Sequence, residues 1–185
     1  MQQIDQSVLF FLNGLHNQFF DVFFWYATDK FVYLPLYIIA TWLAYKQFGK
    51  KIWILLLFVI LTVALTDQSC NIIKDAVARL RPSRNPDIKS LIHIVSGYDG
   101  GDYGFPSAHA CNTFGIAVFL YCVLRPKRWG FTLALFAWAT LMSYSRIYLG
   151  VHYPLDILCG AVLGVLIGWG MAAVFRKWMK FIFSS

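Results

Sequence analysis

Long apolar runs that contain no Asp, Lys or Arg dominate the chain. They cover residues 31–45, 52–66, 103–124, 129–145 and 157–175. A helix needs about 20 mostly apolar residues to cross roughly 30 Å of hydrocarbon, and the last three runs come close to this length as they stand. The first two reach it if a few polar groups lie at their ends. The pattern predicts an all-α fold, a polytopic bundle of about five transmembrane helices.

The first 21 residues follow a different pattern. Apolar side chains recur there at helical spacing among polar ones, at Ile4, Val8, Phe11, Leu15 and Phe19. A helix with one apolar and one polar face is typical of a segment that lies in the membrane interface without crossing it. We therefore expect an interfacial amphipathic helix over residues 1–21.

Proline and glycine residues indicate where the spans begin and end. Arg81-Pro82 ends any continuation of the second span, because proline lacks an amide donor and restricts the residue before it. Residues 83–105 are rich in Gly and Pro, which predicts an outer loop that could act as a lid. The expected spans run from about 22–31 to 45, from about 52 to 73, from Ser107 onwards, over about 129–148 and from Pro154 onwards. We expect a single domain over residues 1–185.

Composition excludes several classes of protein. Of the 185 residues, 59% are hydrophobic and only 14% are charged. A soluble domain has about 45–50% apolar and about 25% charged residues. An aromatic content of 18% excludes a disordered chain. All nine acidic residues are Asp, so the chain holds neither an HExxH motif nor an EF-hand. The cysteines (Cys70, Cys111, Cys122 and Cys159) fall in expected spans without paired spacing, and we expect neither a disulfide nor a metal site from them.

The net charge of +7 is compatible with nucleic acid, an anionic membrane surface or an anionic substrate as the partner. The apolar runs leave little surface for nucleic acid, so we expect none. One group of basic residues alternates with the spans and falls on one side of the membrane, which the positive-inside rule makes cytoplasmic. It comprises Lys46, Lys50, Lys51, Arg125, Lys127, Arg128, Arg176, Lys177 and Lys180.

A second group of basic residues falls on the opposite side, against that rule. It comprises Lys74, Arg79, Arg81, Arg84, Lys89 and Arg146. Ionisable groups in or near the membrane are costly, and their placement there indicates a function for some of them. We expect this side to face the periplasm or outside of a bacterial inner membrane.

Cations and a helix start combine on this outer side. Lys74 and Arg81 are two helical turns apart and can project to one face. The segment Ser107-Ala108-His109 begins a helix, where free backbone N–H groups and the helix dipole favour an anion. Together with Arg146 these residues predict a site for a phosphate, whose oxygens the planar guanidinium matches.

His152 and Asp156 are four residues apart, so the carboxylate can accept a hydrogen bond from one imidazole nitrogen. This fixes the tautomer and leaves the other nitrogen free to attack. His109 is a second imidazole, suited to protonating a leaving group. Taken alone, Asp156 could simply cap a helix and Arg146 could be an interfacial anchor. Their coincidence on one side of a small protein favours a functional site.

Gly160, Gly164 and Gly168 recur every four residues in the last span, and Asp156 lies on the same stripe. Small residues at this spacing permit close contact between helices. We expect the stripe to face the bundle interior and to serve packing.

At these residues the chain resembles the type 2 phosphatidic acid phosphatase (PAP2) superfamily. The family signature is Lys-x6-Arg-Pro, then Pro-Ser-Gly-His, then Ser-Arg-x5-His-x3-Asp. The matching positions are Lys74, Arg81 and Pro82, then Pro106, Ser107 and His109, then Ser145, Arg146, His152 and Asp156. Ala108 stands where the family usually has glycine, and alanine would be strained there if the position required a positive φ.

The resemblance implies a metal-independent phosphatase, without a cofactor, that works through a phosphohistidine. It makes His152 the nucleophile, Asp156 its support and His109 the acid for the leaving oxygen and then the base for water. It also implies that the phosphoryl oxygens are held by Lys74, Arg81 and Arg146, with hydrogen bonds from Ser107 and the Ala108 amide.

Membrane members of the family act on phosphatidic acid, phosphatidylglycerophosphate, undecaprenyl pyrophosphate or the 1-phosphate of lipid A. We expect a lipid phosphate or pyrophosphate of this kind as substrate, reached from the outer leaflet, and no obligate protein partner. Five spans and a short loop favour a small headgroup over a large glycolipid. The alternatives are a lipid A 1-phosphatase and a non-catalytic membrane protein that binds an anion or lipid. Binding alone needs cations but no nucleophile, so His152 and Asp156 favour an enzyme.

Overall fold

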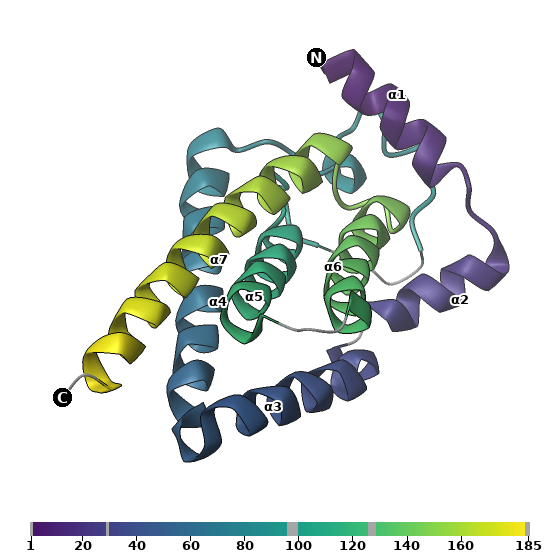
Figure 1. The fold of residues 1–185 in the computed structure, drawn as a ribbon. Helices are drawn as coiled ribbons and strands as arrows, with labels where there is room; N and C mark the ends of the chain where they lie inside the picture. Colours follow the sequence, from purple (N-terminus) through teal and green to yellow (C-terminus); the bar gives the residue numbers. More distant parts are fainter. Residues whose placement is uncertain (1, 29, 96–99, 126–128, 184–185) are drawn as a thin grey trace.

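The computed structural model describes residues 2–28, 30–95, 100–125 and 129–183, and within these ranges it contains helices but no named strand (Figure 1). An isolated antiparallel bridge joins Leu80 to Tyr103. The α-helices are α1 (Gln2–Asn13), α2 (Gln18–Ala27), α3 (Leu34–Phe48), α4 (Ile52–Val77), α5 (Ala108–Leu124), α6 (Trp129–Tyr148) and α7 (Pro154–Phe183). Short 3-10 helices are η1 (Lys30–Tyr33), η2 (Gly49–Lys51) and η3 (Pro82–Arg84).

The expected spans correspond to α3, α4, α5, α6 and α7. Helix α6 has the predicted limits, and α5 begins directly after Ser107, whose side chain accepts a hydrogen bond from the Ala110 amide. Helix α4 continues past residue 73 to Val77. Two of its polar residues, Thr66 and Asp67, contact α5 and lie within the helix. There Thr66 Oγ1 lies 2.5 Å from Asn112 Oδ1, and Asp67 accepts a hydrogen bond from Asn112.

Helix α5 lies at the centre of the bundle, in contact with α4, α6 and α7 (Figure 1). From Phe114 to Leu124 it is apolar on all sides, which suits a central position between other helices. It runs parallel to α7, since Gly160, Gly164 and Gly168 face Ser107, Cys111 and Gly115 in the same order. It runs antiparallel to α4, since Asn112 contacts Asp67 whereas Phe119, further along α5, stacks on Phe58. The starts of α5 and α7 and the end of α4 therefore meet at one end of the bundle. The end of α6 joins them, because the His152 amide donates to the Arg146 carbonyl.

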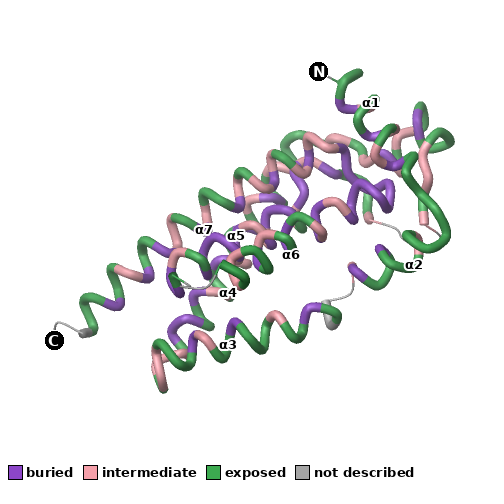
Figure 2. Tube along the Cα trace, turned by 45° about the vertical axis from the view of Figure 1, so that its right-hand side comes forward, coloured by how far each residue is buried: buried purple, intermediate pink, exposed green. Residues whose placement is uncertain are grey.

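The outward faces of the helices carry large exposed apolar side chains. Figure 2 shows that exposed positions recur along α3 and α7. Examples of the exposed apolar side chains are Trp42, Ile60, Leu166 and Trp169. Such a surface suits lipid and not water. By length and composition, the helical stretches Leu34–Val77 and Pro154–Ile182 can cross a membrane. The fold is thus a polytopic membrane bundle, as the sequence predicts.

The glycine stripe packs α7 against α5, as expected. A Cβ atom added to Gly160, Gly164 or Gly168 would collide with the backbone of α5 or of its cap, at Ser107, Cys111 and Gly115. Backbone atoms cannot rotate away as a side chain can. The stripe therefore fixes Ser107, and with it the start of α5, against the start of α7.

Replacing Gly164 with alanine is expected to destabilise the protein by about 1–3 kcal/mol, the usual cost of overpacking. Gly170→Ala is the matched control, because its added Cβ meets nothing within 4 Å and alanine favours helix. Thermal unfolding of the two purified variants in detergent should show a lowered midpoint for Gly164→Ala alone. Equal midpoints would contradict the packing role.

The N-terminal segment differs from the single interfacial helix that the sequence predicts over 1–21. Helix α1 ends at Asn13 and α2 begins at Gln18, where Asn17 accepts a hydrogen bond from the Phe20 amide (2.9 Å). The apolar residues Ile4 and Phe11 are exposed as expected. Part of the polar face points into the protein, however, and its residues are buried because they find specific partners there.

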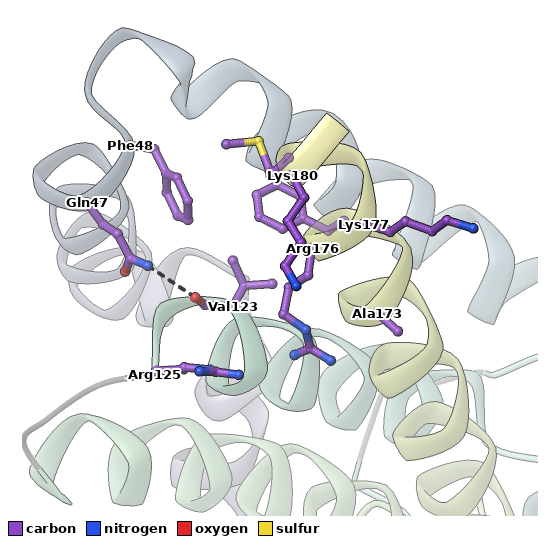
Figure 3. Close-up of a pocket in the computed structure, with 10 residues that line it drawn as sticks. Gln47, Phe48, Val123, Arg125, Ala173, Arg176, Lys177 and Lys180 are labelled. Atoms are coloured by element: carbon purple, nitrogen blue, oxygen red, sulfur yellow. Dashed lines mark hydrogen bonds between the residues drawn. The ribbon is translucent and has the colours of Figure 1, made fainter. Parts of the chain in front are cut away.

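Basic residues lie at both ends of the bundle, as the alternation of charges predicts. A pocket of about 660 Å³ at one end is lined by Gln47 and by a cluster of four cations, Arg125, Arg176, Lys177 and Lys180 (Figure 3). Its wall includes a hydrogen bond from Gln47 Nε2 to the Val123 carbonyl (3.3 Å). The motif residues lie at the opposite end. Lys127 and Arg128, from the same predicted basic group, lie outside the described residues.

Candidate active site

The structure brings all the predicted site residues to the end of the bundle where α5 and α7 begin. Ser107, Arg146, His152 and Asp156 are buried there; Lys74, Arg81 and Ala108 are half-buried, and His109 is exposed. Within electrostatic range of His109 lie Arg146, His152, Arg81 and Lys74. Two imidazoles and several cations thus share one site.

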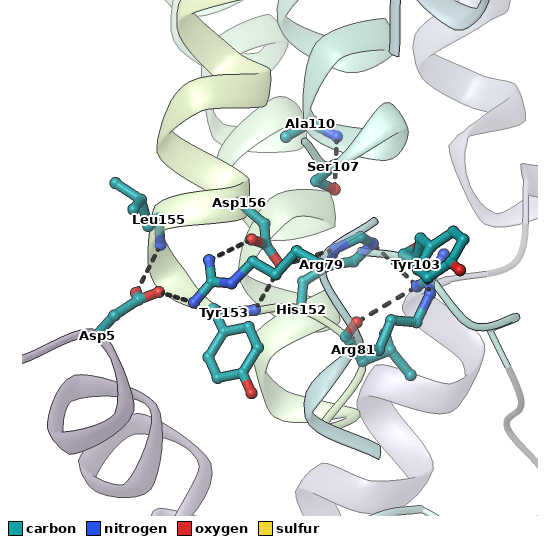
Figure 4. A network of polar contacts seen from close by, with 11 residues as sticks. Asp5, Arg79, Arg81, Tyr103, Ser107, Ala110, His152, Tyr153, Leu155 and Asp156 are labelled. Carbon is teal, nitrogen blue, oxygen red and sulfur yellow. Dashed lines mark hydrogen bonds and ion pairs between the residues drawn. The ribbon is translucent and has the colours of Figure 1, made fainter. Parts of the chain in front are cut away.

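His152 lies in the turn between α6 and α7, with its ring between the guanidinium of Arg81 and the carboxylate of Asp156 (Figure 4). Its Nε2 is 3.1 Å from Arg81 Nη1, and its Nδ1 is 3.4 Å from Asp156 Oδ2. A guanidinium can only donate hydrogen bonds. Nε2 must therefore be the accepting nitrogen, and the ring proton sits on Nδ1, facing Asp156. This is the tautomer that a nucleophilic Nε2 requires.

The contact between His152 and Asp156 is longer than a well-formed N–H···O hydrogen bond. Catalytic hydrogen bonds are often long before substrate binds and tighten in the complex. Asp156 Oδ2 also accepts a hydrogen bond from the Tyr153 amide (3.0 Å), at the start of α7. Asp156 therefore does both things that the sequence allows: it caps a helix and faces the imidazole.

Burial lowers the pKa of His152 to about 4. The neighbouring Asp156 carboxylate raises this pKa, and the charge of Arg81 lowers it further, but burial is the largest effect. The imidazole is therefore neutral at neutral pH, as a nucleophile must be.

The start of α5 is fixed to α7 by a backbone hydrogen bond from the Ser107 amide to the Asp156 carbonyl (2.9 Å). Ala108 is the first residue of α5 and has an ordinary helical backbone. Among the non-glycine residues of the described ranges, positive φ angles occur at Ala78 and Arg125. The strain that alanine would cause at a positive φ therefore does not arise, and Ala108 is compatible with this site.

Arg79 also lies in the site, although the sequence assigned it no role. Its Nη1 is 2.7 Å from Asp156 Oδ1, and its Nη2 is 2.6 Å from Asp5 Oδ2 (Figure 4). The guanidinium stacks on the Tyr153 ring at 3.9 Å. Burial lowers the pKa of Arg79, but the two carboxylates outweigh burial and raise it. The position of Arg79 in the outer basic group indicated that it could have a function. Nothing in the sequence indicated Asp5, which lies 74 residues away from it.

The end of the predicted 83–105 loop forms one wall of the site. Arg81 Nε donates to the Tyr103 carbonyl (3.1 Å). A Cβ atom on Gly104 would lie 3.0 Å from Asp156 Oδ2, so glycine lets the loop backbone approach the carboxylate. Gly97 and Asp99 of this loop lie outside the described residues, and its action as a lid stays a prediction. Within the described ranges, no group of three His, Cys or Asp side chains could hold a metal.

The fold defines a helical membrane protein, and one end of its bundle gathers two imidazoles, a carboxylate and several cations. Residues 51–180 match the model of the PAP2 superfamily, and the chain belongs to that superfamily, as its motifs predict. It is a PAP2-type lipid phosphatase or pyrophosphatase, and thus an integral membrane hydrolase.

Two relatives are lipid A 4'-phosphatases. The one from Bacteroides thetaiotaomicron is 42% identical over 173 residues, which cover 91% of this chain and 76% of the relative. The one from Porphyromonas gingivalis is 33% identical over 168 residues, which cover 90% of this chain and 70% of the relative. A solved transmembrane PAP2 type phosphatidylglycerolphosphate phosphatase from Bacillus subtilis has the same fold, with a TM-score of 0.71 at 21% identity over 95% of this chain and 86% of that one.

Proposed function

We propose that this protein removes a phosphate from lipid A, in the first place the 4'-phosphate, at the outer face of a bacterial inner membrane. The observation that carries the proposal is the neutral His152 held between Asp156 and Arg81 at the end of the bundle. The similarity to two lipid A 4'-phosphatases over at least 90% of the chain supports the choice of substrate. Phosphatidic acid, phosphatidylglycerophosphate, undecaprenyl pyrophosphate and the 1-phosphate of lipid A are the competing substrates.

The relatives favour a glycolipid over the small headgroup that the sequence suggests. The number of spans and the length of the loop limit how much of a lipid the bundle can enclose. The phosphorylated headgroup, however, lies outside the hydrocarbon, so these features set no limit on the size of the sugar.

In the proposed reaction, Nε2 of His152 attacks phosphorus while the bond between phosphorus and the lipid oxygen breaks. His109 enters this step in its protonated form, which the negative charge of the bound phosphate stabilises, and donates its proton to the leaving oxygen. In the second step His109 takes a proton from water as the water oxygen attacks phosphorus. The bond from phosphorus to Nε2 then breaks, which releases inorganic phosphate and restores neutral His152.

Charge stabilisation supplies much of the catalysis in phosphoryl transfer. Arg81 now lies against Nε2, and in the complex its guanidinium would move to a phosphoryl oxygen. Lys74 and Arg146 would hold the others, together with Ser107 and the backbone amide of Ala108 at the start of α5. Arg79 pairs with the carboxylates of both Asp5 and Asp156, so neither is left to bind a metal ion. In the proposed chemistry the cations of the chain itself neutralise the phosphate.

Phosphate release in excess chelator tests this function. The purified protein should release phosphate from lipid A 1,4'-bisphosphate, and mass spectrometry should find the 1-phosphate retained. Phosphatidic acid, phosphatidylglycerophosphate and undecaprenyl pyrophosphate serve as parallel substrates. Strict dependence on Mg²⁺ would contradict the mechanism, and release from one of the other lipids alone would reassign the substrate.

The pH profile is expected to reflect the state of His152. Protonated imidazole cannot attack, so kcat/KM should stay high below neutral pH and fall only as the pH approaches about 4. The profile should be measured with a soluble phosphate ester whose second pKa is known. The titration of the substrate can then be separated from that of the enzyme. An acidic limb near 6.5, the ordinary pKa of histidine, would show that His152 is not the titrating nucleophile.

A further inference from the structure

Helix α1 docks on the catalytic end through a stripe of one residue per turn. Its buried residues are Asp5, Leu9 and Asn13. Leu9 packs in a cluster with Ile147 and Tyr153. Asn13 Nδ2 donates to the carbonyls of Ile147 (3.2 Å) and Tyr148 (2.8 Å), at the end of α6. These contacts hold Asp5 beside the start of α7.

Asp5 binds two groups there, one with each carboxylate oxygen (Figure 4). Oδ1 accepts a hydrogen bond from the Leu155 amide (2.8 Å), which belongs to the first turn of α7. Oδ2 pairs with Arg79 Nη2 at 2.6 Å. The side chain is only 6% exposed. A buried carboxylate with two partners therefore links α1 both to α7 and to the site.

Arg79 is shared between two carboxylates, and each takes one terminal nitrogen of its fork. A guanidinium facing a single carboxylate tends to bind both of its oxygens. Because Asp5 occupies Nη2, Asp156 contacts Arg79 through Oδ1 alone. Its Oδ2 is then left for the Tyr153 amide and for His152 Nδ1.

We propose that Asp5 and Arg79 are positioning residues for the hydrolysis: Asp5 divides the Arg79 fork so that Asp156 keeps one oxygen directed at His152. Helix α1 thereby contributes to catalysis. This role rests on the proposed function, because it assumes that His152 is the nucleophile.

The test is the kinetics of Asp5→Asn on the lipid that the parent hydrolyses fastest. The amide oxygen of asparagine can still accept from Leu155, but the charge that holds Nη2 is gone. We expect kcat to fall about ten- to a hundredfold, since small misplacements in a site have effects of this size. KM should change little, because Lys74, Arg81 and Arg146 are untouched. The acidic limb should move to lower pH, because His152 loses carboxylate support.

Asp87→Asn is the matched control, since it removes the same charge from an exposed position on the outer loop. It should behave as the parent does. Thermal unfolding midpoints report whether each variant is folded. If Asp5→Asn fails to fold, Arg79→Lys and Arg79→Gln provide the test. Lysine keeps a positive charge beside the Asp156 carboxylate, so Arg79→Lys should retain more of kcat than Arg79→Gln.

A double-mutant cycle shows whether Asp5 acts through Arg79. In an Arg79→Gln background, Asp5→Asn should have little further effect on kcat. Equal losses in both backgrounds would overturn the coupling. An active parent with an unaffected, folded Asp5→Asn variant would overturn this role alone. A parent that releases no phosphate from any of the lipids would overturn the proposed function and this role with it.

Discussion

Replacing His152 with alanine is expected to lower the rate of phosphate release at least about a thousandfold, because it removes the proposed nucleophile, a ring nitrogen held between a guanidinium and a carboxylate. The cations that hold phosphate remain, so the variant should still bind the lipid. Turnover and lipid binding, measured on the same purified protein, separate the two effects.

His16→Ala is a suitable control for this variant, because His16 is exposed and lies outside the site. It should keep the turnover of the parent. Residual activity of His152→Ala near the parent's level, in a folded protein, would remove His152 from the reaction. A protein that only binds lipid would show no turnover in any of the three forms.

Replacing Asp156 with asparagine should lower kcat by up to about 10⁴, the loss seen when the carboxylate that orients a catalytic histidine is made neutral in a serine protease. The amide oxygen can still accept from the Tyr153 amide, so the cap of α7 survives. The ion pair with Arg79 and the support of the imidazolium-like intermediate are lost. The amide NH₂ could also face Nδ1 and favour the wrong tautomer.

Steady-state kinetics and thermal unfolding of Asp156→Asn should be measured together. Asp156 is fully buried and paired with Arg79. Breaking a buried ion pair destabilises the protein, and here it should also slow the reaction. A variant that is folded at the assay temperature and has a strongly reduced kcat supports the assigned role. Unchanged turnover would mean that Asp156 only caps the helix.

Much of this fold follows from the apolar runs alone. A segment in lipid must satisfy its backbone hydrogen bonds internally, so a long apolar run leaves helix as the available structure. The existence of α5, α6 and α7 follows in this way, and Pro106 and Pro154 add where α5 and α7 begin. The N-terminal segment does not, because the partners that bury Asp5 and Asn13 are distant in sequence, and periodicity reports only that they are polar.

The site was predictable where motif residues lie near helix ends that meet in space. These residues come together because α4 and α6 end where α5 and α7 begin; they are Lys74, His109, Arg146 and His152. The sharing of Arg79 between Asp5 and Asp156 was not predictable. It depends on side-chain geometry across 74 residues of chain, and a single ion pair leaves no periodic trace in a sequence.

Rapid alkaline quenching tests most directly whether phosphate passes through His152, because phosphohistidine survives alkali. The protein would be mixed briefly with its lipid substrate, quenched and digested, and the peptide containing His152 examined by mass spectrometry. A phosphoryl group on His152, absent from the His152→Ala variant, is the predicted result. Phosphate release at the parent's rate with no phosphoryl group on this peptide, or with one on another residue, would contradict the mechanism.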